Sequence, residues 1–189
     1  LIFCSGINLY FLLTISSIGL IFLSYMIIYI PKFNYIKARI FSFFDKETGT
    51  HNFQSDKAIE SITSGGFFGK GIGEGTLKNR VPEAHTDYII SVISEEFGVI
   101  AIILILILFL VLIYMVFKKI SYETEEQNKL ILIGSVSLIL MQATIHIGVN
   151  LRLFPTTGMT LPFLSYGGSS IVSTSILTGI ILNLTKRKI

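Results

Sequence analysis

The sequence predicts an all-α integral membrane protein, a polytopic bundle with four transmembrane helices of which proline and glycine break the last. Three observations predict this fold class. Hydrophobic residues make up 51% of the chain and charged residues only 14%, whereas soluble domains carry roughly 25% charged residues. Charged residues are absent from four long runs, at 1–31, 97–117, 130–151 and 153–185. About 20 apolar residues cross the hydrocarbon core of a bilayer, so each run is long enough to span it.

The first predicted span covers residues 1–30 and ends at Pro31, because proline stops a helix. The run has neither the basic start nor the small-residue cleavage site of a signal peptide, so we exclude that interpretation. Because the chain begins at Leu1 inside an apolar run, we expect it to be part of a longer protein. Cys4 is the single cysteine and cannot form an internal disulfide.

Residues 31–86 are predicted to form a large extracytoplasmic loop with interfacial segments. The stretch KFNYIKARIFSFF mixes aromatic and basic residues, which suits a segment lying in the headgroup layer. QSDKAIESITSGG indicates a short helix, and the glycine-rich SGGFFGKGIGEG follows it. That loop matches no nucleotide-binding motif, because Lys70 is followed by Gly71 and Glu74 stands where a dinucleotide fingerprint needs glycine.

Two interpretations of the glycine-rich loop stay open. The one we favour is a loop whose backbone must turn tightly or approach a ligand closely. The alternative is a cradle of backbone amides for a lipid pyrophosphate, assisted by Lys70, Lys78 and Arg80.

Five ionisable groups precede the second predicted span, residues 87–117: they are Glu83, His85, Asp87, Glu95 and Glu96. The charge-free residues from Phe97 onward already cross the bilayer, so the turns from about 86 to 96 lie at headgroup depth or in a cavity lined by protein. Pro82 is suited to open this helix. Acidic groups near that start would complement the helix dipole, whereas we expect Glu95 and Glu96 to pair with Lys or Arg of neighbouring helices.

No metal site is predicted from these residues, because the chain has neither an HExxH motif nor a cysteine pattern. A divalent cation such as Mg²⁺ or Mn²⁺, loosely held by carboxylates, is the only cofactor we consider. The net charge of +3 indicates membrane orientation rather than nucleic-acid binding.

The remaining elements are a loop at 118–129, a third span at 130–150, a loop at 151–159, a broken span at 160–185 and a tail at 186–189. Lysine and arginine are concentrated beside the span ends in 118–129 and in the tail, which favours the cytoplasmic side for both. His146 lies one turn from Gln142 and Asn150, a spacing that favours a hydrogen-bonded contact between helices.

The last span is interrupted by Pro155, by Pro162 and by the sequence SYGGSS. Non-helical backbone at membrane depth survives only where it is buried in protein or lines a cavity. Broken helices of this kind often form binding sites, so the last interruption supplies four predicted substrate-binding residues, Ser165, Gly167, Gly168 and Ser169.

Four segments, in order, resemble the SEDS family of bacterial cell-wall proteins (shape, elongation, division and sporulation): QSDKAIESI, SGGFFGKGIGEG, PEAHTDYIISVISEEFG and FPTTGMTLPFLSYGGSS. The likeness covers the chain from Arg39 onward. It is strongest to the cell-division branch, FtsW, and the rod-shape branch, RodA, is the rival. The resemblance implies a bundle of about ten transmembrane helices, of which this chain would supply the last four.

The resemblance further implies that the protein polymerises lipid II into glycan strands at the outer face of the bacterial cytoplasmic membrane, at the division septum. A class B penicillin-binding transpeptidase and other divisome membrane proteins would be its partners. The essential acidic residue of the family falls on Asp87 in the HTD motif, with Glu83, His85 and Thr86 as substrate-binding neighbours. Thr157 stands where some relatives carry lysine, so no cation is expected there.

Two other functions are compatible with the sequence. A lipid II flippase suits the broken last span, but it predicts ionisable residues near the bilayer midplane, where the charge-free cores hold only His146. A non-catalytic scaffold that recruits a transpeptidase would tolerate the loss of the Asp87 carboxylate.

Overall fold

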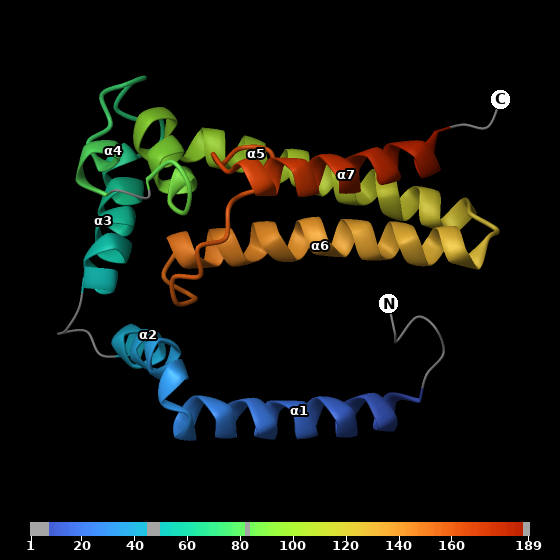
Figure 1. Cartoon of the computed structure of the whole chain (residues 1–189). Helices are drawn as coiled ribbons and strands as arrows, with labels where there is room; N and C mark the ends of the chain where they lie inside the picture. Colours follow the sequence, from blue (N-terminus) through green and yellow to red (C-terminus); the bar gives the residue numbers. More distant parts are fainter. Residues whose placement is uncertain (1–7, 45–49, 82–83, 187–189) are drawn as a thin grey trace. The chain divides into compact units, whose positions relative to one another are not determined.

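The computed structural model describes residues 8–44, 50–81 and 84–186, and the chain divides into two compact units, 1–52 and 53–189. Both units are helical (Figure 1), and the described residues include no β-strand. Four helices are long and apolar enough to cross a membrane, namely α1 (Leu9–Tyr29), α5 (Ile89–Tyr122), α6 (Glu126–Asn150) and α7 (Gly168–Thr185). The predicted all-α fold of a multi-pass membrane protein is therefore confirmed.

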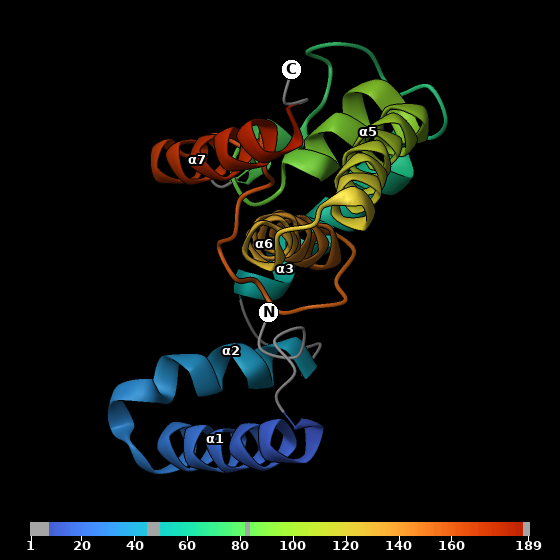
Figure 2. The ribbon, with the colours of Figure 1, turned by 90° about the vertical axis from the view of Figure 1, so that its right-hand side faces the viewer.

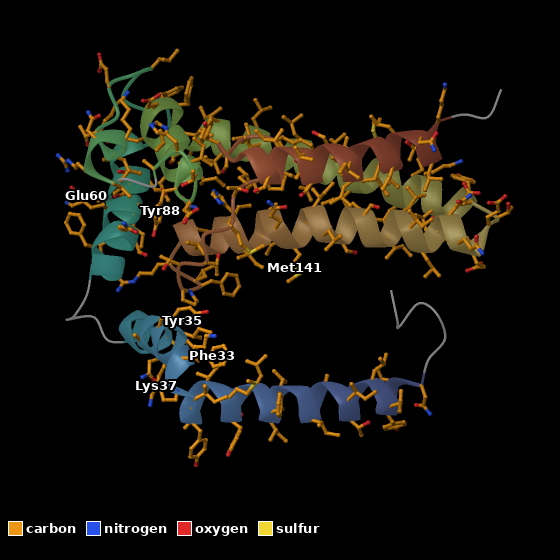
Figure 3. All side chains as sticks on the ribbon, viewed as in Figure 1. Phe33, Tyr35, Lys37, Glu60, Tyr88 and Met141 are labelled. Atoms are coloured by element: carbon orange, nitrogen blue, oxygen red, sulfur yellow. The ribbon has the colours of Figure 1, made fainter. Side chains whose placement is uncertain are left out.

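The first unit consists of one long helix and a short segment that crosses its end. The side chain of Asn8 caps α1 by accepting a hydrogen bond from the Tyr10 N–H at 3.1 Å. Pro31 then opens the short 3₁₀ turn η1 (Pro31–Phe33), which leads into α2 (Asn34–Phe44). Figures 1 and 2 show that α2 runs across the end of α1 rather than alongside it. Aromatic and basic side chains, among them Tyr35 and Lys37, gather at this turn (Figure 3). The interfacial position of this segment stays a prediction.

The second unit is built on three long helices, α5, α6 and α7, which lie side by side (Figures 1 and 2). A short connection, 123–125, joins α5 to α6. Apolar side chains from all three helices form a shared core, whose buried members are Val116, Leu132, Val136, Ile139 and Ile181. This core fixes the three helices as one bundle.

Two shorter helices, α3 (Thr50–Gly65) and α4 (Leu77–Arg80), lie at the end of the bundle where α5 begins (Figure 1). A second buried cluster joins them to α5 and to the last turn of α6; it contains Ala58, Leu77, Val81, Ala84, Tyr88, Val92 and Val149. Figure 3 shows Tyr88 at this junction. The cluster anchors the residues that carry the HTD motif.

The broken last span is helical only in its second part. Residues 151–167 have no regular helix, and α7 begins at Gly168. Pro155 and Pro162 lie in the irregular stretch, as expected for residues that cannot continue a helix. The predicted interruption therefore lies before the helix rather than inside it.

Candidate functional site

The HTD motif lies in a turn that leads directly into α5. Residues 84–88 form this turn, and the helix begins at Ile89. The helix start that we expected at Pro82 is therefore wrong by about two turns. Pro82 and Glu83 themselves lie outside the described residues. Asp87 consequently stands before the helix and not on its first turn.

Three hydrogen bonds from other parts of the chain hold the backbone of this turn. The His85 carbonyl accepts a hydrogen bond from the Tyr166 N–H at 3.1 Å. The Thr86 carbonyl accepts one from the Ser165 hydroxyl at 2.8 Å, and the Asp87 carbonyl accepts one from the Asn150 side-chain amide at 2.9 Å. Three consecutive carbonyls thus bind donors from the last turn of α6 and from the stretch before α7.

The side chains of the motif are less buried than those of its neighbours Ala84 and Tyr88. The side chain of His85 is exposed, and those of Thr86 and Asp87 are half-buried. The stretch after α6 comes alongside the carboxylate, since a Cβ placed on Gly158 would lie 3.8 Å from Asp87 Oδ2. A half-buried carboxylate on a fixed backbone is suited to accept a proton from a bound hydroxyl.

Polar side chains of α6 hold the irregular stretch in place. Gln142 Nε2 donates to the Thr160 carbonyl at 2.9 Å and to the Ser170 hydroxyl at 3.1 Å. His146 donates from Nδ1 to the Met159 carbonyl at 2.8 Å. These bonds replace some of those that a helix would have supplied. The predicted contact role of the polar residues of α6 is confirmed, although they bind mainly this stretch.

The predicted substrate-binding residues of the SYGGSS sequence lie at the start of α7. Ser165 is buried, and its hydroxyl is used inside the protein, because it donates to Thr86 and accepts from the Leu161 N–H at 2.8 Å. Gly167 precedes the helix, Gly168 begins it, and Ser169 is exposed. Gly168 faces open space, since a Cβ added there would meet no atom within 4 Å. The first two amides of α7, at Gly168 and Ser169, lie two and three residues beyond Tyr166, which binds His85.

The three predicted cations do not converge on Asp87. Lys70 Nζ is 2.8 Å from Glu95 Oε1, and Lys78 Nζ is 3.0 Å from Glu96 Oε1. Arg80 pairs more loosely, 3.8 Å from Glu60, and its side chain is 51% exposed. The expected pairing of Glu95 and Glu96 with basic residues is present: Lys78 comes from the neighbouring helix α4, as expected, whereas Lys70 comes from the glycine-rich loop.

The glycine-rich loop packs backbone against backbone on a kink in α5. Gly98 has a φ of 78° inside that helix. The kink leaves backbone carbonyl and N–H groups of α5 without partners in the helix, and the loop binds them. The Lys70 N–H donates to the Glu95 carbonyl at 2.9 Å, and the Val99 N–H donates to the Gly66 carbonyl at 3.0 Å. A Cβ on Gly69 would lie 2.2 Å from the Glu96 carbonyl oxygen. The tight turns expected of the loop are present, with positive φ at Gly69, Gly71 and Gly73. Its close approach is to the backbone of α5, whereas the sequence suggested an approach to a ligand.

An apolar groove adjoins the turn that holds the HTD motif. A cavity of about 200 Å³ lies between α5 and residues 162–164; it is lined by Ile105, Leu108, Phe109, Leu112, Pro162, Phe163 and Leu164. Leu164, which lines this cavity, is followed in the chain by Ser165 and Tyr166, and these two residues bind the Thr86 and His85 carbonyls. The groove is therefore bordered by the residues that directly precede Ser165 and Tyr166, the two donors to the HTD turn.

The described part of the chain gathers no three His, Cys, Asp or Glu side chains that could hold a metal ion. The residues near Asp87 that are described therefore do not fit a cation site by themselves. Glu83, the remaining acidic residue of the motif region, lies outside that part.

Asn150 is the site residue whose role the sequence did not predict. It was expected, with Gln142 and His146, to make a contact between helices, and its bond to Ser91 of α5 is such a contact. Its bond to the Asp87 carbonyl was not expected. The available signal was a polar amide inside an otherwise apolar span, which indicates a hydrogen-bonded partner without identifying it.

Comparison with known proteins agrees with these observations. A profile of the FtsW, RodA and SpoVE family, described as cell cycle proteins, matches residues 1–189. The chain is 41% identical to a probable peptidoglycan glycosyltransferase FtsW of Enterococcus hirae over 138 residues, which are 72% of this chain and 35% of that protein. It is 35% identical to the FtsW of Trichlorobacter lovleyi over 189 residues, 98% of this chain and 49% of the relative.

A sporulation protein and a solved structure are also similar. The stage V sporulation protein E of Bacillus subtilis is 38% identical over 135 residues, which cover 71% of this chain and 37% of that protein. A chain of a peptidoglycan synthase complex has the same fold, with a TM-score of 0.71 and 24% identity, over 93% of this chain and 48% of the other. The chain thus spans about half the length, or less, of the proteins it matches.

Proposed function

Because the chain belongs to the FtsW, RodA and SpoVE family of cell cycle proteins, we propose that it carries the catalytic carboxylate of a peptidoglycan glycosyltransferase. The reaction joins two lipid-linked disaccharides, one as glycosyl donor and the other as acceptor. The observation that carries the proposal is the half-buried Asp87, held on a fixed turn whose binding partners adjoin an apolar groove.

The proposed chemistry is a single displacement. The 4-hydroxyl of the acceptor sugar attacks C1 of the donor and gives its proton to the Asp87 carboxylate as the new O4–C1 bond forms. The bond from C1 to the pyrophosphate oxygen breaks, and its electron pair leaves with the lipid pyrophosphate. Attack opposite the leaving group inverts the configuration at C1.

The leaving pyrophosphate needs positive partners, and the site offers two kinds. The N-terminus of α7 at Gly168 presents unpaired backbone amides and the positive end of a helix dipole. Arg80 is the cation with the loosest pairing, since it is 3.8 Å from Glu60 and half-exposed. Lys70 and Lys78 would have to leave Glu95 and Glu96 in order to bind substrate. A divalent cation that arrives with the pyrophosphate stays a prediction, and no step is assigned to it.

The remaining site residues would bind the sugars and the lipid. His85 is exposed beside Asp87 and can donate a hydrogen bond to a sugar hydroxyl, as can Thr86. Ser169 is exposed at the start of α7, beside Gly167. The groove between α5 and residues 162–164 suits the prenyl chain, because its lining is apolar. Glu83 is proposed from the motif alone.

The cellular setting is part of the same proposal. Four helices able to cross a membrane support a multi-pass membrane protein; the proposal puts it in the bacterial cytoplasmic membrane, with the HTD turn on the outer side. A transpeptidase would crosslink the glycan strands, as the name of the similar synthase complex, which coordinates polymerization and crosslinking, describes for that assembly. The similarity to FtsW proteins supports action at the division septum as part of the proposal.

The deciding experiment compares lipid II polymerisation by the full-length protein, with its transpeptidase partner, and by Asp87→Asn. This substitution keeps the shape and removes the base, so we expect product formation to fall at least about 100-fold. Asp56→Asn is the matched control, because Asp56 is half-exposed and pairs with Arg152 outside the motif. Equal polymerisation by wild type and Asp87→Asn overturns the assignment, and lipid II translocation in vesicles without glycan product identifies a flippase instead.

A further inference from the structure

Asn150 is fully buried and uses every hydrogen-bonding position of its side chain. Its exposed fraction is 0%. Oδ1 accepts from the Ser91 N–H at 3.2 Å and from the Ser91 hydroxyl at 2.7 Å. Nδ2 donates to the Asp87 carbonyl and to the His146 carbonyl, both at 2.9 Å. Two donors and two acceptor positions are all that a side-chain amide offers, so its orientation is completely determined.

These bonds make Asn150 the cap of a helix to which it does not belong. A helix usually begins at a residue whose side chain accepts from the N–H two or three positions later. Tyr88 occupies that position in α5 and makes no such bond. Asn150 of α6 supplies the missing acceptor to Ser91, the third residue of α5. The start of α5 directly after Asp87 is therefore set by a side chain that lies 63 residues further along the chain.

The same amide fixes one of the two peptide groups that flank the Cα of Asp87. The Asp87 carbonyl belongs to the peptide group on the C-terminal side and is held by Asn150. The Thr86 carbonyl belongs to the peptide group on the N-terminal side and is held by the buried hydroxyl of Ser165. With both peptide planes held, the backbone torsions φ and ψ of Asp87 are fixed, and so is the point from which its side chain extends.

We propose that Asn150 and Ser165 are positioning residues, which clamp the two peptide groups around Asp87 so that its carboxylate meets the acceptor hydroxyl at reacting distance. The proposal rests on the proposed function, in which Asp87 is the general base. Neither side chain touches the substrate in this mechanism. A misplacement of a reacting group by about 1 Å costs on the order of 100-fold in rate, so loosening either bond should slow the chemical step without weakening substrate binding.

The test uses Asn150→Asp in the full-length protein. This side chain has nearly the same shape and keeps the acceptor for Ser91, but it places an oxygen where the Asp87 carbonyl needs a donor. We expect kcat for lipid II polymerisation to fall about 10- to 100-fold while KM stays within about twofold. Ser165→Ala removes the donor to Thr86 and should show the same division between kcat and KM.

A double-mutant cycle separates positioning from general damage to the fold. If Asn150 acts through Asp87, adding Asn150→Asp to Asp87→Asn should leave the residual rate unchanged within about twofold, because the group that was positioned is already gone. Gln142→Leu is the matched control, since it removes another amide of α6, one that binds Thr160 and Ser170 and makes no bond to the HTD turn. Its effect should add to that of Asp87→Asn.

The outcomes are distinguishable. If Asp87→Asn abolishes polymerisation while folded Asn150→Asp and Ser165→Ala keep wild-type kcat, the positioning proposal is wrong and the proposed function stands. If Asn150→Asp does not fold, Ser165→Ala decides alone. If the loss of rate caused by Asn150→Asp or Ser165→Ala adds fully to that of Asp87→Asn, the clamp does not act through Asp87. Full activity of Asp87→Asn overturns the function itself.

Discussion

The ammonium group of Lys70 lies 2.8 Å from the carboxylate of Glu95, whose side chain is 1% exposed, and the two residues join the glycine-rich loop to α5. Two further donors complete the carboxylate, because Thr76 donates to Oε1 at 3.1 Å and the Leu77 N–H donates to Oε2 at 3.0 Å. The same carboxylate thus fixes the loop and the first residue of α4. An anionic group this deep in the protein requires a cation, which gives Lys70 a structural role whether or not it also contacts substrate.

Removing Lys70 should therefore destabilise the protein. In Lys70→Met the buried Glu95 keeps two hydrogen bonds and loses its counter-charge. Removal of one partner of a buried pair costs about 3–5 kcal/mol, and we expect roughly 2–4 kcal/mol because the Lys70 side chain is 36% exposed. Thermal unfolding of the purified full-length protein in detergent measures the loss.

The matched variant for Lys70 is the double change Lys70→Met with Glu95→Gln, which removes both charges and keeps an acceptor for the Leu77 N–H. It should recover part of the lost stability. A Lys70→Met protein that melts like wild type yet polymerises lipid II poorly would contradict the structural role and favour the predicted contact with pyrophosphate.

Alanine at Gly98 should disrupt the contact between the kink of α5 and the glycine-rich loop. Gly98 has a φ of 78°, and a Cβ there would lie 2.2 Å from the Phe67 carbonyl oxygen. Strain from the positive φ costs on the order of 1–3 kcal/mol, and the backbone overlap adds to it. We expect a clearly lower melting temperature and increased protease cleavage in residues 66–75.

Gly179→Ala supplies the control for Gly98, because Gly179 lies inside α7 and a Cβ there meets no atom within 4 Å. Alanine is favoured over glycine within a helix by up to about 1 kcal/mol, so this protein should melt at or slightly above the wild-type temperature. Equal melting temperatures for the Gly98 and Gly179 variants would show that the loop does not depend on the kink.

The spans could be predicted from the sequence because their signal is local. A charge-free run such as 97–117 is long enough to cross a bilayer whatever its neighbours are, and Pro155 and Pro162 break a helix by their own geometry. The start of α5 could not be predicted in this way. Its cap is Asn150, which is distant in sequence and is brought to Ser91 only when α5 and α6 pack together.

The site shows the same division between local and long-range information. Asp87 was found because the HTD motif is contiguous and resembles a known family. The pairing of Lys70 with Glu95, and of Lys78 with Glu96, joins residues 25 and 18 positions apart, and sequence spacing does not select these partners. Lys70 and Lys78, which the sequence suggested as pyrophosphate ligands, are therefore paired with the carboxylates of Glu95 and Glu96.

Tyr88 should make stability fall at alkaline pH. Burial raises the pKa of its hydroxyl above the usual 10.0, the hydrogen bond with Ser55 partly opposes this, and the negative charge of Asp87 adds to it. The folded protein therefore favours the neutral phenol more than the unfolded chain does. This contribution is fully present below the unfolded pKa of about 10 and is lost as the pH rises through the higher folded pKa.

Tyr88→Phe isolates this effect, because it keeps the ring in its buried cluster and removes the group that ionises. At neutral pH the variant loses only the 3.4 Å contact with Ser55, so it should cost about 0.5–1 kcal/mol. Melting temperatures between pH 8 and 11.5 should fall more steeply for wild type than for Tyr88→Phe, and the two curves should converge or cross above pH 10. Parallel curves over the whole range would show that Tyr88 ionises as readily in the folded protein as in the unfolded chain, which its burial beneath α3 does not allow.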